Sequence, residues 1–220
     1  MAIEAKDYVA KTQSYFHGER RDLIDQLEGS STRQILEIGC GDGATGAYAK
    51  REGKCGRYIG VELFPEAAKI ASQYLDKVYV ANIETFEVPE ECELSDVLIA
   101  SEVLEHLIDP LAVLRKLYKN LVPGALVFAS SPNIAHYSTL RMLIAGHWDL
   151  TDSGRMDRTH MRWFTPKTYA SMFEDSGFEV LSVRPLVPFR RKARVLNFLT
   201  GSRYEHLFVS QIVLQGRRTK

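Results

Sequence analysis

The chain has 220 residues, 45% of them apolar, and its 28 Lys and Arg residues balance 28 Asp and Glu residues. This length and composition predict one globular domain with a full core and exclude a disordered chain. A net charge of zero provides no overall field for nucleic acid or anionic membranes. The N-terminus lacks an apolar signal core, and no apolar run reaches the ~20 residues of a membrane span. The three cysteines show no metal-ligand spacing, so we expect a cytoplasmic protein without a disulfide framework.

Short apolar runs rich in β-forming residues alternate with helical patterns over the first 131 residues, which predicts a parallel sheet with helices on both faces. The last two predicted strands are joined by a long irregular segment rather than a crossover helix, so we expect them to be antiparallel. The expected fold is α/β, a doubly wound, mostly parallel seven-stranded sheet with an antiparallel last strand. The predicted strands are 34–38, 58–61, 77–81, 96–101, 125–131, 179–187 and 206–215, and the predicted helices are 43–52, 65–74, 109–121 and 166–176.

The first predicted strand runs into a glycine-rich loop, with Gly39, Gly41 and Gly43, that opens a helix. Glycines let the backbone turn tightly and approach a ligand, and the helix start offers unpaired amides. The Gly-x-Gly-x-Gly spacing differs from the Gly-x-Gly-x-x-Gly of dinucleotide sites. Glu37, at the end of the strand, would repel a pyrophosphate but attract a cationic ligand.

This block resembles motif I of the class I S-adenosylmethionine (SAM)-dependent methyltransferases, whose cofactor carries an ammonium and a sulfonium. The resemblance implies a Rossmann-like methyltransferase domain over residues 1–220, with SAM as the cofactor. Segment 1–30 is polar, aromatic and helical in pattern, and in this family such a segment often forms a lid over the cofactor. Arg21 within it resembles an arginine that pairs with the methionine carboxylate, although an exposed helix arginine is an equal alternative.

Ligands of doubly wound sheets lie beyond the carboxyl ends of the strands, and polar residues follow several predicted strands here. Glu62, next to Leu63, ends the second strand about 20 residues after the glycine loop, where a carboxylate can accept hydrogen bonds from both ribose hydroxyls. Asn82 and Ile83 follow the third strand and resemble the Asp-Ile/Leu pair that contacts adenine in the family. Asn replaces the usual Asp and is also a common turn residue. Ser101 ends the fourth strand.

Glu102, Glu105 and His106 follow Ser101 in a Glu-x-x-Glu-His pattern. At a helix start these residues would occupy positions i, i+3 and i+4 on one face. Two carboxylates and one imidazole suit a divalent cation, whereas acids at a helix start also simply complement the helix dipole.

A second histidine, His160, lies in a charged and aromatic stretch before a helix start at Thr165-Pro166. Ubiquinone-pathway O-methyltransferases and small-RNA terminal 2′-O-methyltransferases carry a similar pair of motifs. The resemblance implies Mg²⁺ or Mn²⁺ held by Glu102, Glu105, His106 and His160. The flanking Arg158 and Arg162 oppose cation binding unless an anionic acceptor pairs with them. Without a metal, His106 or His160 would act as general base.

Segment 133–165 is expected to form an insertion on the acceptor side, and it also resembles methyltransferases found beside bacterial O-antigen and capsule genes. That resemblance implies polysaccharide biosynthesis and a sugar acceptor, and metal chelation predicts an acceptor with vicinal oxygens. The basic run Arg190–Arg194 could meet an anionic acceptor or a membrane surface, but such runs are more often solvated.

The favoured prediction is therefore a SAM-dependent O-methyltransferase acting on a small molecule, a sugar or another vicinal diol. The alternatives are a quinone-precursor catechol or an RNA 3′ end as acceptor, or a non-catalytic SAM-binding regulator. RNA is disfavoured by the neutral charge. An NAD-dependent dehydrogenase is disfavoured by the glycine spacing and Glu37.

Overall fold

The fold was analysed in a computed structural model, which describes residues 18–92, 94–188, 197–198 and 200–219. Most of the predicted lid and the basic run Arg190–Arg194 lie outside the described residues. Among the residues described, no helix is both long and apolar enough to cross a lipid bilayer.

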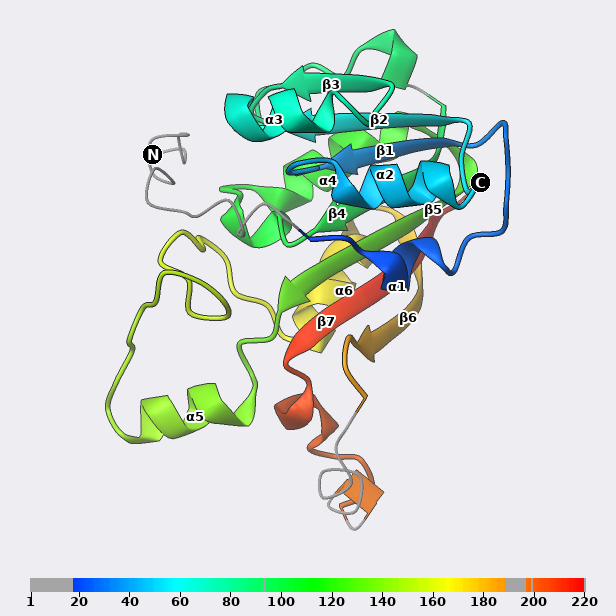
Figure 1. The fold of residues 1–220 in the computed structure, drawn as a ribbon. Helices are drawn as coiled ribbons and strands as arrows, with labels where there is room; N and C mark the ends of the chain where they lie inside the picture. Colours follow the sequence, from blue (N-terminus) through cyan, green and yellow to red (C-terminus); the bar gives the residue numbers. More distant parts are fainter. Residues whose placement is uncertain (1–17, 93, 189–196, 199, 220) are drawn as a thin grey trace.

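A seven-stranded sheet forms the centre of the molecule, in the order β3-β2-β1-β4-β5-β7-β6 (Figure 1). The first five strands are parallel, and β7 is antiparallel to both of its neighbours, β5 and β6. This arrangement confirms the predicted doubly wound sheet with its antiparallel last strand. The strands are β1 (Gln34–Ile38), β2 (Arg57–Glu62), β3 (Lys77–Val80), β4 (Ser95–Ser101), β5 (Leu121–Pro132), β6 (Phe178–Pro185) and β7 (Gln211–Arg218).

Helices cover both faces of this sheet because neighbouring residues of each buried strand point to opposite sides. Leu36 and Leu98 pair across β1 and β4 and belong to one apolar cluster, whereas Ile35 and Val97, one residue earlier, belong to the other. The helices are α1 (Arg21–Ile24), α2 (Ala44–Arg51), α3 (Pro65–Ala71), α4 (Pro110–Lys119), α5 (Tyr137–Ile144) and α6 (Pro166–Asp175).

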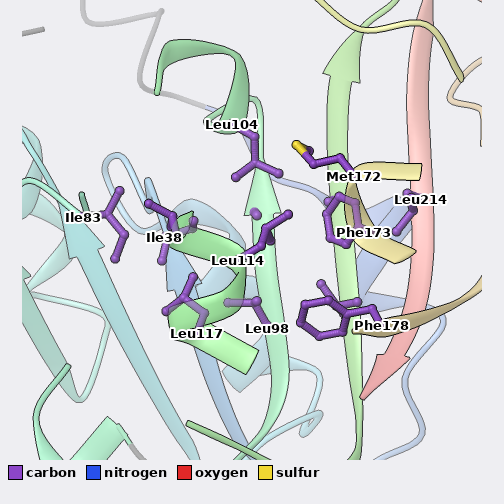
Figure 2. Close-up of a cluster of buried hydrophobic side chains, with 14 of the residues drawn as sticks. Ile38, Ile83, Leu98, Leu104, Leu114, Leu117, Met172, Phe173, Phe178 and Leu214 are labelled. Carbon is purple, nitrogen blue, oxygen red and sulfur yellow. The ribbon is translucent and has the colours of Figure 1, made fainter. Parts of the chain in front are cut away.

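The larger apolar cluster lies between the sheet and helices α4 and α6 (Figure 2). Leu114 and Leu117 of α4 and Phe173 of α6 are fully buried in it. The smaller cluster takes Leu23 from α1 and Ala49 from α2 on the opposite face. Packing on both faces fixes the sheet, so the loops at its carboxyl edge project from a rigid base.

Strand β7 and helix α5 differ from the prediction. Strand β7 begins at Gln211 rather than near 206, because Glu205–Phe208 forms a 3₁₀ helix. Helix α5 was not predicted; it lies in the excursion after β5 and stands away from the sheet (Figure 1). Its start is marked only by His136, whose side chain accepts a hydrogen bond from the Ser138 amide.

Candidate active site

A cavity of about 480 Å³ lies at the carboxyl edge of the parallel strands. Strand ends β1, β2, β4 and the residues just after β3 contribute to its wall, as expected for a doubly wound sheet. The sequence-predicted residues in its lining are Glu37, Gly39, Gly41, Glu62, Leu63, Asn82, Ile83, Ser101, Glu102, Glu105, His106 and His160. Gly43 and Arg21 are the two predicted site residues that do not line it.

The glycine loop turns because its glycines adopt left-handed backbone angles, with φ of 55° at Gly41 and 82° at Gly43. Gly43 caps α2, and a Cβ there would lie 2.9 Å from the Cα of Ala71. Its glycine is therefore required for packing α2 against α3, while Gly39 and Gly41 face the cavity.

Glu62 is buried and anchors the glycine loop to β2. Its carboxylate accepts hydrogen bonds from the Gly41 amide at 2.8 Å and the Phe64 amide at 2.9 Å. Burial raises the pKa of this carboxyl above its ordinary value, against the effect of these amides. Each oxygen has a second lone pair, so the residue can still accept a bond from a ligand hydroxyl.

Glu37 is a buried acid under the loop, and it accepts a hydrogen bond from the Tyr58 hydroxyl at 2.8 Å. Burial raises the pKa of Glu37 to about 8, and the Tyr58 hydroxyl and the Arg20 charge oppose that rise. A cationic ligand in the cavity would favour the ionised form of this carboxyl.

Asn82 lines the cavity and also forms a turn, because its side-chain oxygen accepts a hydrogen bond from the Glu84 amide at 2.9 Å. The turn directs the chain out of β3 and leaves Ile83 against the core with 6% of its surface exposed.

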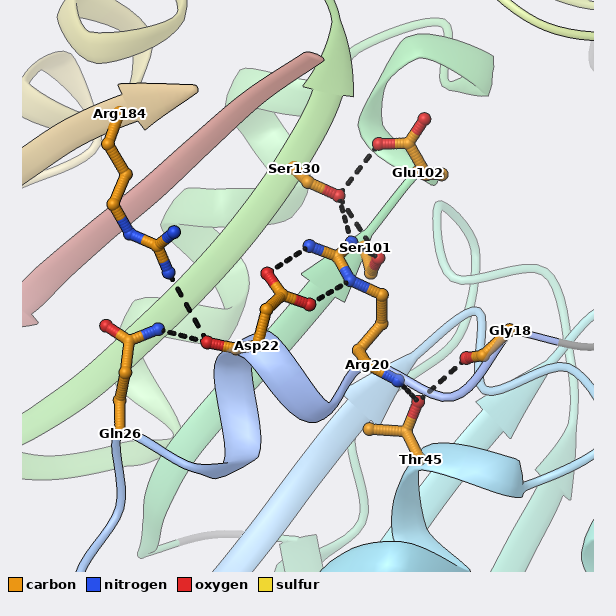
Figure 3. A network of polar contacts seen from close by, with 9 residues as sticks. All are labelled: Gly18, Arg20, Asp22, Gln26, Thr45, Ser101, Glu102, Ser130 and Arg184. Atoms are coloured by element: carbon orange, nitrogen blue, oxygen red, sulfur yellow. Dashed lines mark hydrogen bonds and ion pairs between the residues drawn. The ribbon is translucent and has the colours of Figure 1, made fainter. Parts of the chain in front are cut away.

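Arg20, rather than Arg21, reaches the cavity. The Arg21 side chain is 63% exposed and pairs with Glu19 at the surface. Arg20 instead forms a two-point ion pair with Asp22 and donates to hydroxyls at the ends of β4 and β5, those of Ser101 and Ser130 (Figure 3). The adjacent arginines give no sequence signal that distinguishes them, since the difference depends on how α1 meets the sheet.

The segment after β4 is not the α-helix start expected from the Glu-x-x-Glu-His pattern. Leu104–His106 forms a 3₁₀ helix, and α4 starts only at Pro110, where the Asp109 side chain accepts from the Ala112 amide. Glu102 has a left-handed φ of 54°, which no α-helix start would give it. Its carboxylate accepts a hydrogen bond from the Ser130 hydroxyl at 2.7 Å.

Three of the four predicted metal ligands converge. Glu105, His106 and His160 each present a ligand atom within 4.8 Å of the others, and the two imidazole centroids are 4.7 Å apart. Glu102 lies outside this group. Backbone bonds from the Met161 and Arg162 amides to the Glu105 carbonyl tie the 157–162 loop to the sheet edge, which brings His160 into place.

Glu105 is 1% exposed, and neither carboxylate oxygen has a hydrogen-bond partner among the described residues. Burial, with the nearby charge of Glu102, holds the pKa of Glu105 well above its ordinary value. A buried acid without a partner is costly, so this position needs a proton or a cation.

The two histidines have matching orientations. His106 Nδ1 lies 3.2 Å from the Thr159 carbonyl oxygen, and His160 Nδ1 lies 3.2 Å from the Arg155 carbonyl oxygen. A carbonyl can only accept, so each Nδ1 carries the proton and the lone pair of the neutral ring is on Nε2. This arrangement is typical of imidazoles that bind a metal or accept a proton.

Comparison with known proteins agrees with this geometry. The family model described as a methyltransferase domain matches residues 12–183. The chain belongs to this methyltransferase family. It is a class I SAM-dependent methyltransferase with a Rossmann-like fold.

Curated relatives named ubiquinone biosynthesis O-methyltransferase include one from Hydrogenovibrio crunogenus, 25% identical over 72% of this chain and 67% of that enzyme. Another, from Pseudomonas savastanoi pv. phaseolicola, is 27% identical over 74% of this chain and 72% of that enzyme.

Solved methyltransferase structures share the fold. A SAM-dependent methyltransferase from Archaeoglobus fulgidus matches 94% of this chain and 97% of its own with a TM-score of 0.62 and 21% identity. The N-methyltransferase NodS from Bradyrhizobium japonicum, in complex with S-adenosyl-L-homocysteine (SAH), matches 91% of this chain and 86% of its own with a TM-score of 0.59 and 17% identity.

Proposed function

We propose that the enzyme methylates a hydroxyl of a small molecule with vicinal oxygens, a sugar or similar diol, with a divalent cation at Glu105, His106 and His160. The observation that carries the proposal is the buried Glu105 carboxylate, which has no hydrogen-bond partner among the described residues. It lies beside two imidazoles whose Nδ1 protons are donated to backbone carbonyls. The curated relatives named as O-methyltransferases support oxygen as the acceptor atom.

The donor set fits such an ion chemically. One carboxylate and two neutral imidazoles suit a borderline divalent metal such as Mn²⁺, and Mg²⁺ would favour a further oxygen ligand. Glu102 is the nearest source of that oxygen in the sequence motif, and it also lines the cavity. A bound cation would lower the pKa of a coordinated acceptor hydroxyl and orient it.

The cofactor half of the cavity fits SAM in charge and shape. Glu62 has lone pairs for the two ribose hydroxyls, and Gly39 and Gly41 leave room for close approach of the backbone. Glu37 offers negative charge to the cationic end of the cofactor, and Arg20 offers positive charge to its carboxylate. Adenine would lie beside Asn82 and Ile83.

The reaction is an in-line displacement. The acceptor oxygen forms a bond to the methyl carbon, the carbon–sulfur bond breaks, and its electron pair stays on sulfur as the thioether forms. With a cation at the site, the acidified hydroxyl would release its proton to solvent; without a cation, Nε2 of His106 or His160 would take it up, which is why those two imidazoles are the candidate catalytic residues.

A quinone-precursor catechol is the second candidate acceptor, and the relatives' role in ubiquinone biosynthesis favours it. A catechol also presents vicinal oxygens. Side-by-side turnover of catechols and sugar diols by the purified enzyme separates the two.

The deciding experiment is calorimetric titration of Mg²⁺ and Mn²⁺ into protein saturated with SAH. Wild type should bind one ion, and His160→Ala should lose binding while its SAH affinity stays nearly unchanged. His147→Ala is the matched control, because His147 lies in the same excursion but is 63% exposed. If wild type binds no ion, the histidine-base mechanism replaces the chelate. If His160→Ala turns over normally, His160 has no role in the reaction.

A further inference from the structure

A polar chain connects the cofactor half of the cavity to Glu102 (Figure 3). It begins at Arg20, whose side chain is 12% exposed, and passes through the fully buried Ser130 of β5. Arg20 Nη1 lies 2.6 Å from Ser130 Oγ, and Ser130 Oγ lies 2.7 Å from Glu102 Oε1.

The hydrogen bonds of this polar chain have a fixed order of donors and acceptors. Arginine can only donate, so the hydroxyls of Ser101 and Ser130 both accept from Arg20. The single Ser130 proton is then available to the Glu102 carboxylate, while Ser101, 3.1 Å from Ser130, can donate to it. Arg20 therefore orients the Ser130 hydroxyl toward Glu102.

The same hydrogen bonds account for the position of the Glu102 carboxylate. Glu102 has a left-handed φ, its carboxylate is linked to Arg20 through the Ser130 hydroxyl, and it is not part of the group formed by Glu105, His106 and His160. A non-glycine residue at such a φ is held there by its surroundings, and hydrogen bonds with the Ser130 hydroxyl, at 2.7 Å, and with the Gln211 side chain hold the Glu102 carboxylate.

We propose that Ser130 is a positioning residue that makes Glu102 and the carboxylate of the cofactor compete for the charge of Arg20. The inference rests on the proposed function in one respect, that Arg20 faces the cofactor's carboxylate. When the cofactor engages Arg20, the Arg20–Ser130 bond weakens and so does the hold on Glu102. Cofactor binding thereby alters the acceptor side of the cavity.

A double-mutant cycle tests this link with SAH as the probe, measured by calorimetry without added metal. In the Ser130 background, Glu102→Gln removes the competing charge and should tighten SAH binding about threefold to tenfold. In the Ser130→Ala background, Glu102 keeps its hydrogen bond with the Gln211 side chain but no longer shares a hydroxyl with Arg20, so the same substitution should change SAH affinity less than about twofold.

Two controls make the result specific. The ligand 5′-methylthioadenosine, which lacks the amino-acid part of SAH, should bind all four proteins equally, and its binding also shows that each variant is folded. Ser131→Ala removes the next buried hydroxyl along β5, one without a hydrogen-bond partner among the described residues, and should leave the Glu102→Gln effect intact.

An equal effect of Glu102→Gln in both Ser130 backgrounds would overturn the link, as would an equal effect on 5′-methylthioadenosine. Both results leave the proposed function standing, because SAH still binds. Failure of wild type to bind SAH would instead overturn the proposed function together with the link.

Discussion

Glu37 is a buried acid whose ionisation should affect folding of the ligand-free enzyme. Its pKa is raised from 4.5 to about 8 by burial, so the folded state keeps its proton at neutral pH. A group with a raised folded pKa contributes stability that is complete below about pH 4.5 and is lost as pH rises through about 8. The shift corresponds to at most about 5 kcal/mol.

We therefore expect the unfolding free energy of wild type to fall between pH 6 and pH 9 by more than that of Glu37→Gln. The amide of the variant still accepts the Tyr58 hydrogen bond but has no charge to bury. Urea unfolding at the two pH values measures the difference. Parallel losses in the two proteins would show that Glu37 is ionised in the fold throughout this range.

Glu62 should affect the affinity for the cofactor more than the free energy of unfolding. Glu62→Ala removes the acceptor for two ribose hydroxyls and the bond that holds the Gly41 amide, so the dissociation constant for SAH should rise about 10- to 100-fold. Calorimetry measures it. The matched control is Glu66→Ala, an exposed acid of α3 that does not line the cavity. Equal SAH affinity of the two variants would contradict this position for the ribose.

At the scale of the element, the glycine loop serves two purposes that the sequence pattern alone does not separate. Gly39 and Gly41 line the cavity, whereas Gly43 lets α2 approach α3. Gly43→Ala combines a left-handed φ with a close contact to Ala71. We expect it to destabilise the fold by about 1–2 kcal/mol for the φ and about 1–3 kcal/mol more for the contact.

The control for that prediction is Gly124→Ala. Gly124 has a similar φ of 84°, but no atom lies within 4 Å of the added Cβ. Denaturant unfolding should therefore show only the φ cost there. If both variants lose the same free energy, the contact between α2 and α3 relaxes without cost.

The elements also show what the sequence could predict. Buried parallel strands such as β1 and β4 carry continuous apolar runs, and Thr165 with Pro166 marks the start of α6 through its capping box, so these were predicted within a residue or two. Helix α5 was missed because it is short and packs little on the core: only Thr139 of its eight residues is buried, and the apolar Leu140, Leu143 and Ile144 are exposed. The turn at Glu102 was missed because a left-handed φ at glutamate depends on tertiary contacts.

At the scale of the whole molecule, the sheet explains why distant motifs could be assigned to one site. The carboxyl ends of parallel strands lie at one edge of the sheet. The residues at these ends, such as Glu37, Glu62 and Glu105, were therefore expected to lie together, and they do line one cavity. The choice of Arg20 over Arg21 and the absence of Glu102 from the group of Glu105, His106 and His160 depend on side-chain directions in irregular segments. Periodicity contains no information about those directions.

The whole-molecule consequence is that cofactor binding should stabilise the fold, because the cavity is built from strands that belong to both apolar clusters. At 100 times its dissociation constant, SAH should add about 2.7 kcal/mol and raise the melting temperature by about 5–10 °C. Differential scanning calorimetry measures the shift. NAD⁺ at the same concentration should give none, since the glycine spacing is not that of a dinucleotide loop.

Gly41→Val provides the internal control for that shift. A β-branched side chain at a φ of 55° strains the loop, and it would occupy space where the loop backbone approaches the cofactor. The variant should therefore have a lower melting temperature than wild type and show no shift with SAH. A normal SAH response in Gly41→Val would mean that the ligand binds away from the glycine loop. A response of wild type to NAD⁺ equal to that for SAH would mean that the cavity does not select against a dinucleotide.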